Sequence, residues 1–233
     1  MKISIITLFP KMISGFFEES IVKRAMTKKL VEIEIINLRD FAIDDYGTVD
    51  DRPYGGGVGM ILRVDVIHKA ISKIKNRKSK IVLTSPKGKV FDQKKAQEYS
   101  KLDHLIIISG HYEDVDARVQ DFVDEEISMG DFILTGGEIP ASAIVDSVVR
   151  LIPGVLKKEQ ATISESFNIN GKKILEYPQY TRPEEFMGKK VPEVLLNGDH
   201  KKIEEWRTEK ALEETEEKRP DLFTGASKLD TDK

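Results

Sequence analysis

The chain has 233 residues, a length that predicts one or two domains and is sufficient to bury a substantial core without cross-links. Hydrophobic residues make up 39% and charged residues 33%, which excludes collagen-like, low-complexity and wholly disordered chains. The absence of cysteine excludes disulfides, thiolate metal sites and cysteine nucleophiles. The net charge of −3 does not by itself indicate a nucleic-acid partner.

Strand-like runs of β-branched and apolar residues alternate with helical patterns in the first two thirds of the chain. The runs predict strands at 3–8, 32–37, 80–84 and 104–109. Apolar residues at helical spacing predict helices over 12–30, 65–75, 92–99 and 140–152. Because nearly continuous apolar strands separated by helices indicate a parallel sheet covered on both faces, we expect an α/β domain over residues 1–156.

The character of the sequence changes after this domain. Residues 157–172 are polar without apolar periodicity, which predicts a flexible linker between domains. Asp199 is placed to cap a helix from about His200 to Thr215. We therefore expect a second, smaller and mostly α-helical domain over residues 173–233.

The sequence has no apolar run of the ~18–20 residues that a membrane-spanning helix needs. Its first ten residues are too short for the apolar region of a signal peptide and lack a small-residue cleavage site. We therefore expect a cytoplasmic protein without a membrane partner.

Charge is unevenly distributed along the chain. Residues 69–101 carry a net charge of +9, whereas residues 112–147 carry −9. A basic stretch of this density could neutralise nucleic-acid phosphates. Solvated helix faces that flank a strand explain the same pattern, and charge alone favours that simpler interpretation.

Residues 53–60 (PYGGGVGM) form a glycine-rich segment without the Gly-Lys-Ser/Thr ending of a phosphate loop or the Rossmann spacing. Four glycines in five positions exceed the need of a single turn, which favours close approach of backbone to a ligand or a moving loop. Three further turns, at 84–88, 109–113 and 134–140, follow strand-like runs. Since ligands of open α/β sheets bind beyond the carboxyl ends of strands, these turns together suggest one pocket.

The residue pattern argues against a metal site and against a nucleophile. The four histidines, His68, His104, His111 and His200, have no metal-ligand spacing such as HExxH. A GxSxG nucleophile motif is also absent. Carboxylates and arginines remain as candidate catalytic groups.

Taken as a set, the motifs resemble those of one known family. They are VDDRPYGGGVGM (49–60), LTSPKG (83–88), SGHYEDVDARV (109–119), EISMGDFILTGGEIPA (126–141), DSVVRLIPGVL (146–156), SESF (164–167), LEYPQYTRP (175–183) and VPEVLLNGDH (191–200). In this order and spacing, they identify the chain as similar to the bacterial tRNA (guanine-N1)-methyltransferases of the TrmD type, within the SPOUT class.

The resemblance implies a fold, a cofactor and a substrate. It implies a deep trefoil knot at the carboxyl end of the α/β domain, an exception to the rule that chains avoid threading. It implies a homodimer with a shared active site, which methylates N1 of guanine at tRNA position 37. The methyl donor would be S-adenosylmethionine, with S-adenosylhomocysteine as product; a requirement for Mg²⁺ stays open. The residues implied to bind the cofactor are Thr84, Ser85, Pro86, Gly110, Tyr112, Glu113, Met129, Gly130, Asp131, Phe132, Ile133, Leu134, Gly136, Gly137 and Pro140.

Two residues match the family's catalytic positions. Guanine N1 carries a proton at neutral pH, so its methylation is assisted by a base and by a cation near O6. By resemblance, Glu165 is the base and Arg150 is the cation. Without the resemblance, Arg150 would form an i,i+4 ion pair with Asp146, and Glu165 would be an ordinary exposed acid.

The chain departs from the family pattern at two positions. Asp114 stands where glycine is common, which puts the local backbone in question if that position requires a positive φ. Lys87 stands where glutamine is common. The alternative functions are another SPOUT RNA methyltransferase, acting on a ribose 2′-oxygen or on ribosomal RNA, and a non-catalytic RNA-binding protein.

Overall fold

The computed structural model describes residues 1–157, 165–169 and 171–224. The chain divides into two compact units, Met1–Lys157 and Lys158–Lys233. Residues 158–164 and 170 of the predicted linker lie outside the described residues.

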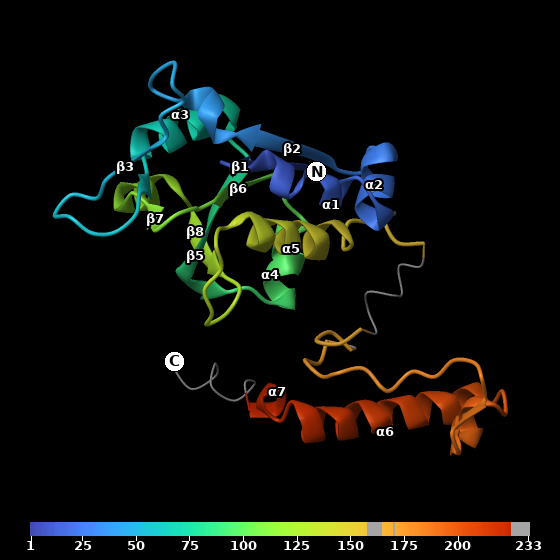
Figure 1. Cartoon of the computed structure of the whole chain (residues 1–233). Helices are drawn as coiled ribbons and strands as arrows, with labels where there is room; N and C mark the ends of the chain where they lie inside the picture. The colour runs from blue at the N-terminus through green and yellow to red at the C-terminus, as the bar shows by residue number, and fades with distance from the viewer. Residues whose placement is uncertain (158–164, 170, 225–233) are drawn as a thin grey trace, which may run out of the picture. The chain divides into compact units, whose positions relative to one another are not determined.

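A parallel sheet of five strands forms the centre of the first unit (Figure 1). Its strands, in spatial order, are β2 (Glu32–Asn37), β1 (Lys2–Thr7), β6 (His104–Ser109), β5 (Ser79–Val90) and β8 (Glu125–Ser128). Each neighbouring pair is parallel. The central strand β6 is buried at every position, as its apolar sequence requires. The predicted α/β class with a parallel sheet is confirmed.

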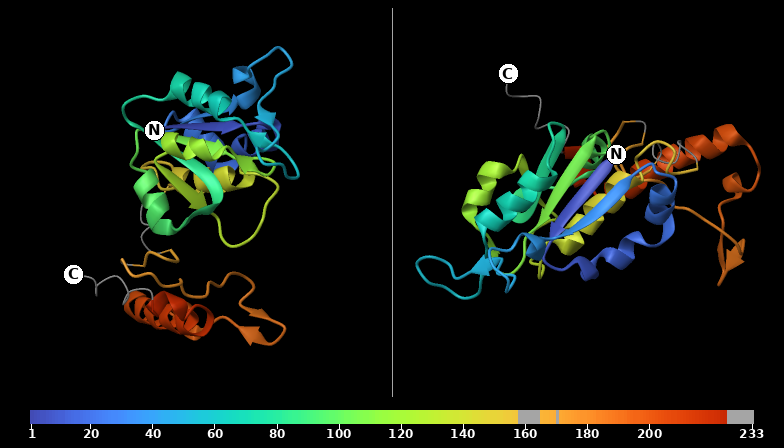
Figure 2. Two further views of the ribbon diagram at one scale, coloured as in Figure 1. Left: turned by 90° about the vertical axis from the view of Figure 1, so that its left-hand side faces the viewer. Right: turned by 90° about the horizontal axis from the view of Figure 1, so that it is seen from above.

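Helices cover both faces of this sheet, and each face has its own apolar core. Helix α3 (Val64–Ile74) packs on one face through four fully buried side chains, among them Val66 and Ile71. Helices α2 (Ser20–Thr27), α4 (Gln93–Tyr99) and α5 (Glu138–Val149) contribute to the core of the other face. Figure 2 shows α3 and α4 on opposite sides of the strands.

Two local predictions are wrong. The single helix expected over 12–30 is interrupted: a 3-10 turn (Pro10–Met12) and α1 (Ser14–Phe17) precede α2. The break lies at Ser20, whose φ of 53° is incompatible with a continuous right-handed helix. Strand β8 was not expected, because Ile127 is its only large apolar residue; pairing with β5 creates this strand.

A small second sheet lies beside the first in the same unit. It consists of β3 (Asp50–Asp51), β4 (Ile61–Leu62) and β7 (Asp114–Val115). Strand β4 pairs antiparallel with β3 and parallel with β7. The remaining elements of this unit are the 3-10 turns Leu38–Phe41 and Ala117–Phe122.

The second unit is built on one long helix, α6 (His200–Lys218). The Asp199 side chain accepts a hydrogen bond from the backbone N–H of Lys202 at 3.2 Å, so the predicted cap and helix are confirmed. Among the described residues of this unit, the other elements are α7 (Asp221–Thr224), the 3-10 turn Glu193–Leu195, and the two short strands β9 (Glu185–Phe186) and β10 (Lys189–Lys190).

The opposed charge blocks partly neutralise each other inside the first unit. Glu125 lies 3.5 Å from Lys80 and 3.2 Å from Lys95, and Asp114 lies 2.5 Å from Lys87. The basic residues of α3 and α4 also lie on opposite faces of the sheet (Figure 2). The +9 stretch is therefore not one continuous basic surface.

Candidate functional site

The carboxyl ends of three parallel strands meet at one edge of the large sheet. In the strand register, Ile6 of β1 is opposite Ile108 of β6, and Thr84 of β5 is opposite Ser109. The turn predicted at 109–113 follows β6, whereas the turn predicted at 84–88 lies within β5, whose pairing with β8 shifts register between Thr84 and Lys89. The two segments start side by side at this edge of the sheet.

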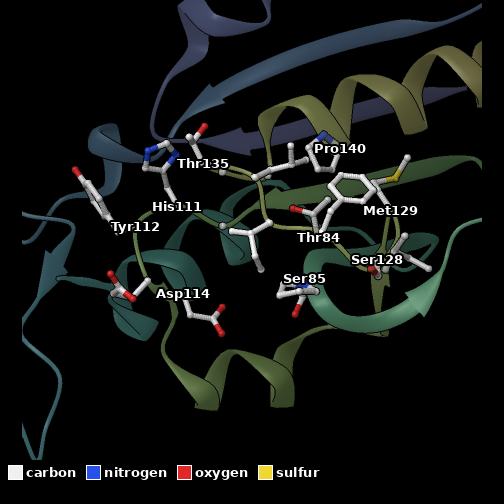
Figure 3. Close-up of a pocket in the computed structure, with 18 of the residues that line it drawn as sticks. Thr84, Ser85, His111, Tyr112, Asp114, Ser128, Met129, Thr135 and Pro140 are labelled. Atoms are coloured by element: carbon white, nitrogen blue, oxygen red, sulfur yellow. The ribbon is translucent and has the colours of Figure 1, made fainter. Parts of the chain in front are cut away.

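A cavity of about 170 Å³ lies at this edge (Figure 3). Every residue predicted to bind the cofactor lines it, except Asp131. Five lining residues were missed: His111, Asp114, Ile127, Ser128 and Thr135. All five belong to recognised motifs, so their neighbours could have indicated them. Ile127 and Ser128 lie on the strand that the sequence did not predict.

The segment around Gly137 lines the cavity and lies very close to the end of β6. The backbone N–H of Gly137 donates to the carbonyl of Gly110 at 2.7 Å. A Cβ on Gly137 would lie 2.8 Å from Cα of Ser109 and 2.9 Å from N of Gly110, so only glycine fits there. The hydroxyl of Thr84 points to the same place and donates to the carbonyl of Ile108 at 3.1 Å.

Tyr112 has an unusual backbone conformation at this cavity. Its φ is 61°, a left-handed value that costs free energy for an aromatic residue. Its ring is 44% exposed and lies edge-on to that of His111, with centroids 5.1 Å apart. Strained backbone of this kind concentrates at functional sites, because surrounding contacts must hold it.

Asp114 does not have the positive φ that its replacement of glycine had put in question. It begins strand β7, where any residue type is accommodated. Its carboxylate lies 2.5 Å from the ammonium of Lys87, and this hydrogen bond raises the pKa of Lys87. The two departures from the family pattern therefore contact each other across the cavity wall.

The glycine-rich segment contacts a lining residue. Met60 accepts a hydrogen bond from the backbone N–H of Glu113 at 3.2 Å. A Cβ on Gly59 would lie 2.5 Å from Cγ of Glu113, and the φ of Gly59 is +84°. The close neighbour of Gly59 is thus a side chain of the cavity wall, and the expected close approach of the segment to a ligand stays a prediction.

The two predicted catalytic residues belong to different units. Arg150 is half-buried directly after α5, and its backbone N–H donates to the carbonyl of Asp146 at 3.3 Å. Glu165 is half-buried in the second unit, and its carbonyl accepts from the backbone N–H of Asn168 at 3.1 Å. The residues beside it fold back on 174–176, since Phe167 N–H donates to the carbonyl of Ile174 at 2.7 Å.

Within residues 1–157, 165–169 and 171–224, no group of three or more histidine, aspartate or glutamate side chains could hold a metal ion. In the same part of the chain, no helix combines the length and apolar character that crossing a membrane requires.

Residues 1–225 match the family model described as tRNA (Guanine-1)-methyltransferase TrmD. The chain belongs to this family. Three relatives are named tRNA (guanine-N(1)-)-methyltransferase. The protein of Dictyoglomus turgidum is 52% identical over 97% of this chain and 91% of its own length. The protein of Clostridium botulinum (strain Alaska E43) is 51% identical over 96% of this chain and 92% of its own length. The protein of Mycoplasmopsis synoviae is 49% identical over 96% of this chain and 97% of its own length.

Membership of the TrmD family explains why three turns that are unremarkable singly line one cavity. It confirms the resemblance stated from the motifs, and it implies the SPOUT fold for the α/β unit.

Proposed function

We propose that this protein transfers a methyl group from S-adenosylmethionine to N1 of guanine at tRNA position 37, next to the anticodon. The match to the TrmD family over residues 1–225 is the observation that carries this proposal. The cavity at the carboxyl edge of the sheet supports it, because methyl transfer needs a site that holds a donor. A cytoplasmic location, where tRNA is found, is part of the proposal.

The residues around the cavity suit S-adenosylmethionine. Apolar side chains such as Met129, Leu134 and Pro140 can contact the adenine ring, and backbone groups of the glycine turns can hydrogen-bond to its edge. The carboxylates of Glu113 and Asp114 can accept from hydroxyl or ammonium groups. When bound, the cofactor supplies an electrophilic methyl group on a sulfonium.

We assign the proton and charge steps to two residues of this chain. Glu165 would accept the N1 proton of guanine, and Arg150 would stabilise the negative charge that develops on O6. The two residues belong to different compact units of the chain. As the family resemblance implies, we propose that the active site forms in a homodimer from parts of both subunits. The second unit would bind the tRNA.

A trefoil knot in the first unit is part of the proposal. Ile127 of β8 pairs with Thr84 and also with Lys89, so β5 contacts β8 on both sides of a register shift between these two residues. A Cβ on Gly88 would collide with the backbone between Glu126 and Ile127. The close approach of β5 and β8 supports a threaded chain. So does the contact that the chain after β8 makes at Gly137 with Gly110, directly after β6.

The test is methylation of tRNA transcripts with guanine or adenine at position 37, followed by mapping of the modified base. We expect 1-methylguanine at position 37 in the first transcript and no product in the second. A 2′-O-methylated ribose, or methylation of ribosomal RNA instead, would favour another SPOUT activity. RNA binding without cofactor binding would favour a non-catalytic protein. The same assay with Mg²⁺ or EDTA decides the metal requirement.

A further inference from the structure

Glu138 is a completely buried carboxylate to which the proposed chemistry assigns no role. It is the first residue of α5, and its side chain has no exposed surface. Among the described residues, it is the only acidic residue that is buried. Burial of a carboxylate is costly unless hydrogen bonds compensate it, so its contacts indicate what it does.

Two side chains from other segments contact this carboxylate. The hydroxyl of Thr7, at the end of β1, donates to Oε1 at 2.8 Å. Nδ1 of His111, in the turn after β6, lies 3.3 Å from Oε2. The hydroxyl of Thr7 also accepts from the backbone N–H of Phe9 at 2.9 Å, which fixes its proton toward Glu138. One carboxylate thus joins the ends of β1 and β6 to the start of α5.

His111 is held tightly between neighbours while it lines the cavity. The ring of Phe9 lies against it, with centroids 4.5 Å apart. On another side, His111 pairs with Gly136, where an added Cβ would collide with both His111 and Glu138. Figure 3 shows the ring next to Thr135 at one end of the cavity. Because its side chain is only 14% exposed, a displaced ring would have to move the backbone turn with it.

The Glu138 contact makes the tautomer of His111 part of the inference, because the donor and acceptor roles of the ring nitrogens depend on it. An ionised carboxylate can only accept hydrogen bonds, so His111 donates to an ionised Glu138 only when Nδ1 carries the proton. In a neutral ring, Nε2 is then the nitrogen with the lone pair. Buried partners of this kind set both the orientation and the tautomer of a histidine.

We propose that Glu138 is a positioning residue: through Nδ1 of His111, it holds the Gly110–Glu113 wall of the cavity in the conformation that binds the cofactor. This rests on the proposed function, since it assumes that S-adenosylmethionine is the ligand of the cavity. It adds a role for a residue that does not line the cavity.

The test compares two isosteric substitutions at hydroxyl–carboxylate pairs, one completely buried at Glu138 and one partly buried at Glu125. Glu138→Gln replaces one of the two carboxylate oxygens by an amide NH2, so Thr7 and His111 no longer both have an acceptor. Glu125→Gln is the matched control, because Glu125 accepts from the hydroxyl of Tyr99 at 2.7 Å but does not line the cavity. In calorimetric titrations, Glu138→Gln should bind S-adenosylmethionine at least about 10-fold more weakly than the wild type. This loss is comparable to that caused by removing the buried hydrogen-bond partner of a ligand-binding histidine. Glu125→Gln should bind like the wild type. Equal effects of both substitutions, or none at Glu138, would overturn the proposal.

A second measurement uses the unsubstituted protein, so it does not depend on the folding of a variant. The ¹⁵N NMR shifts of the imidazole nitrogens, assigned with a His111→Asn sample, should show protonated Nδ1 without cofactor. An Nε2–H tautomer would refute the proposal that His111 donates through Nδ1 to Glu138. If the wild type failed to bind S-adenosylmethionine, the proposed function would fail, whereas the tautomer would still decide whether Glu138 holds His111.

Discussion

Gly137→Ala tests the close approach of Gly137 to Ser109 and Gly110 at the wall of the cavity. The backbone of Gly137 has φ −83° and ψ 0°, a conformation that alanine adopts without strain. Any destabilisation must therefore come from the neighbours of the added methyl group. Two of these are backbone atoms, Cα of Ser109 at 2.8 Å and N of Gly110 at 2.9 Å, and neither can move away by changing a rotamer.

The expected cost follows from these contacts. Overpacking by one methyl group typically costs about 1–3 kcal/mol, and rigid neighbours place this site at the upper end. Displacement of the backbone would also weaken the 2.7 Å hydrogen bond from Gly137 to Gly110, for roughly 1 kcal/mol more. We expect a loss of about 3–4 kcal/mol, which at an m-value of about 2 kcal/mol/M lowers the urea midpoint by roughly 1.5–2 M.

Urea unfolding followed by circular dichroism measures this loss, and calorimetry with S-adenosylmethionine should show binding weakened at least about 10-fold, because this close approach lies at the wall of the cavity. Gly15→Ala is the control: Gly15 lies in α1, has a negative φ and has no neighbour within 4 Å of an added Cβ. It should be neutral or stabilising by up to about 1 kcal/mol. A free energy of unfolding within about 0.5 kcal/mol of the wild type, together with normal binding of S-adenosylmethionine, would show that Gly137 does not approach Ser109 and Gly110 this closely.

Four further outcomes are expected. Glu165→Gln should slow single-turnover methyl transfer by about 100-fold or more, as loss of a general base does; a near-normal rate with bound tRNA would remove Glu165 from the mechanism. Arg150→Ala should slow the chemical step about 100-fold but retain calorimetric cofactor affinity, and selective loss of that affinity would reassign the residue. Burial lowers the pKa of His104, so the unfolded chain binds its proton more readily and stability should decline as pH falls below about 6.5; urea midpoints at pH 7 and 5.5 should differ less in His104→Gln. Lys87→Gln and Asp114→Asn should show coupling of at most about 1 kcal/mol in unfolding, because the pair is partly exposed. Coupling that persists in 1 M salt would contradict this ion-pair interpretation.

Local patterns were sufficient where one element buries a regular apolar face. The helix expected over 65–75 is α3 (Val64–Ile74), and the strand expected over 104–109 is β6. They failed where a non-local contact decides the conformation. Phe17 is buried whereas Phe16 is 47% exposed, because the break before α2 reorients the chain.

The site shows the same division. Motif order identified most of the residues that line the cavity, and of the residues it assigned to the cofactor only Asp131 does not line it. Spacing could not show that the three segments share one cavity, nor could it show strand β8, which exists only through its pairing with β5. Asp114 and Lys87 were noted separately, and only the fold showed that they form an ion pair.

The sequence by itself determined the family, the alternation of strands and helices, and the cap of α6, because each is encoded by residues close together along the chain. The tertiary structure alone decided the burial of Glu138, its contact with His111 and the need for glycine at position 137. Each of these depends on atoms from segments up to 131 residues apart, such as Thr7 and Glu138. No local pattern records such a distance, since packing of the whole sheet and its crossing segments sets it.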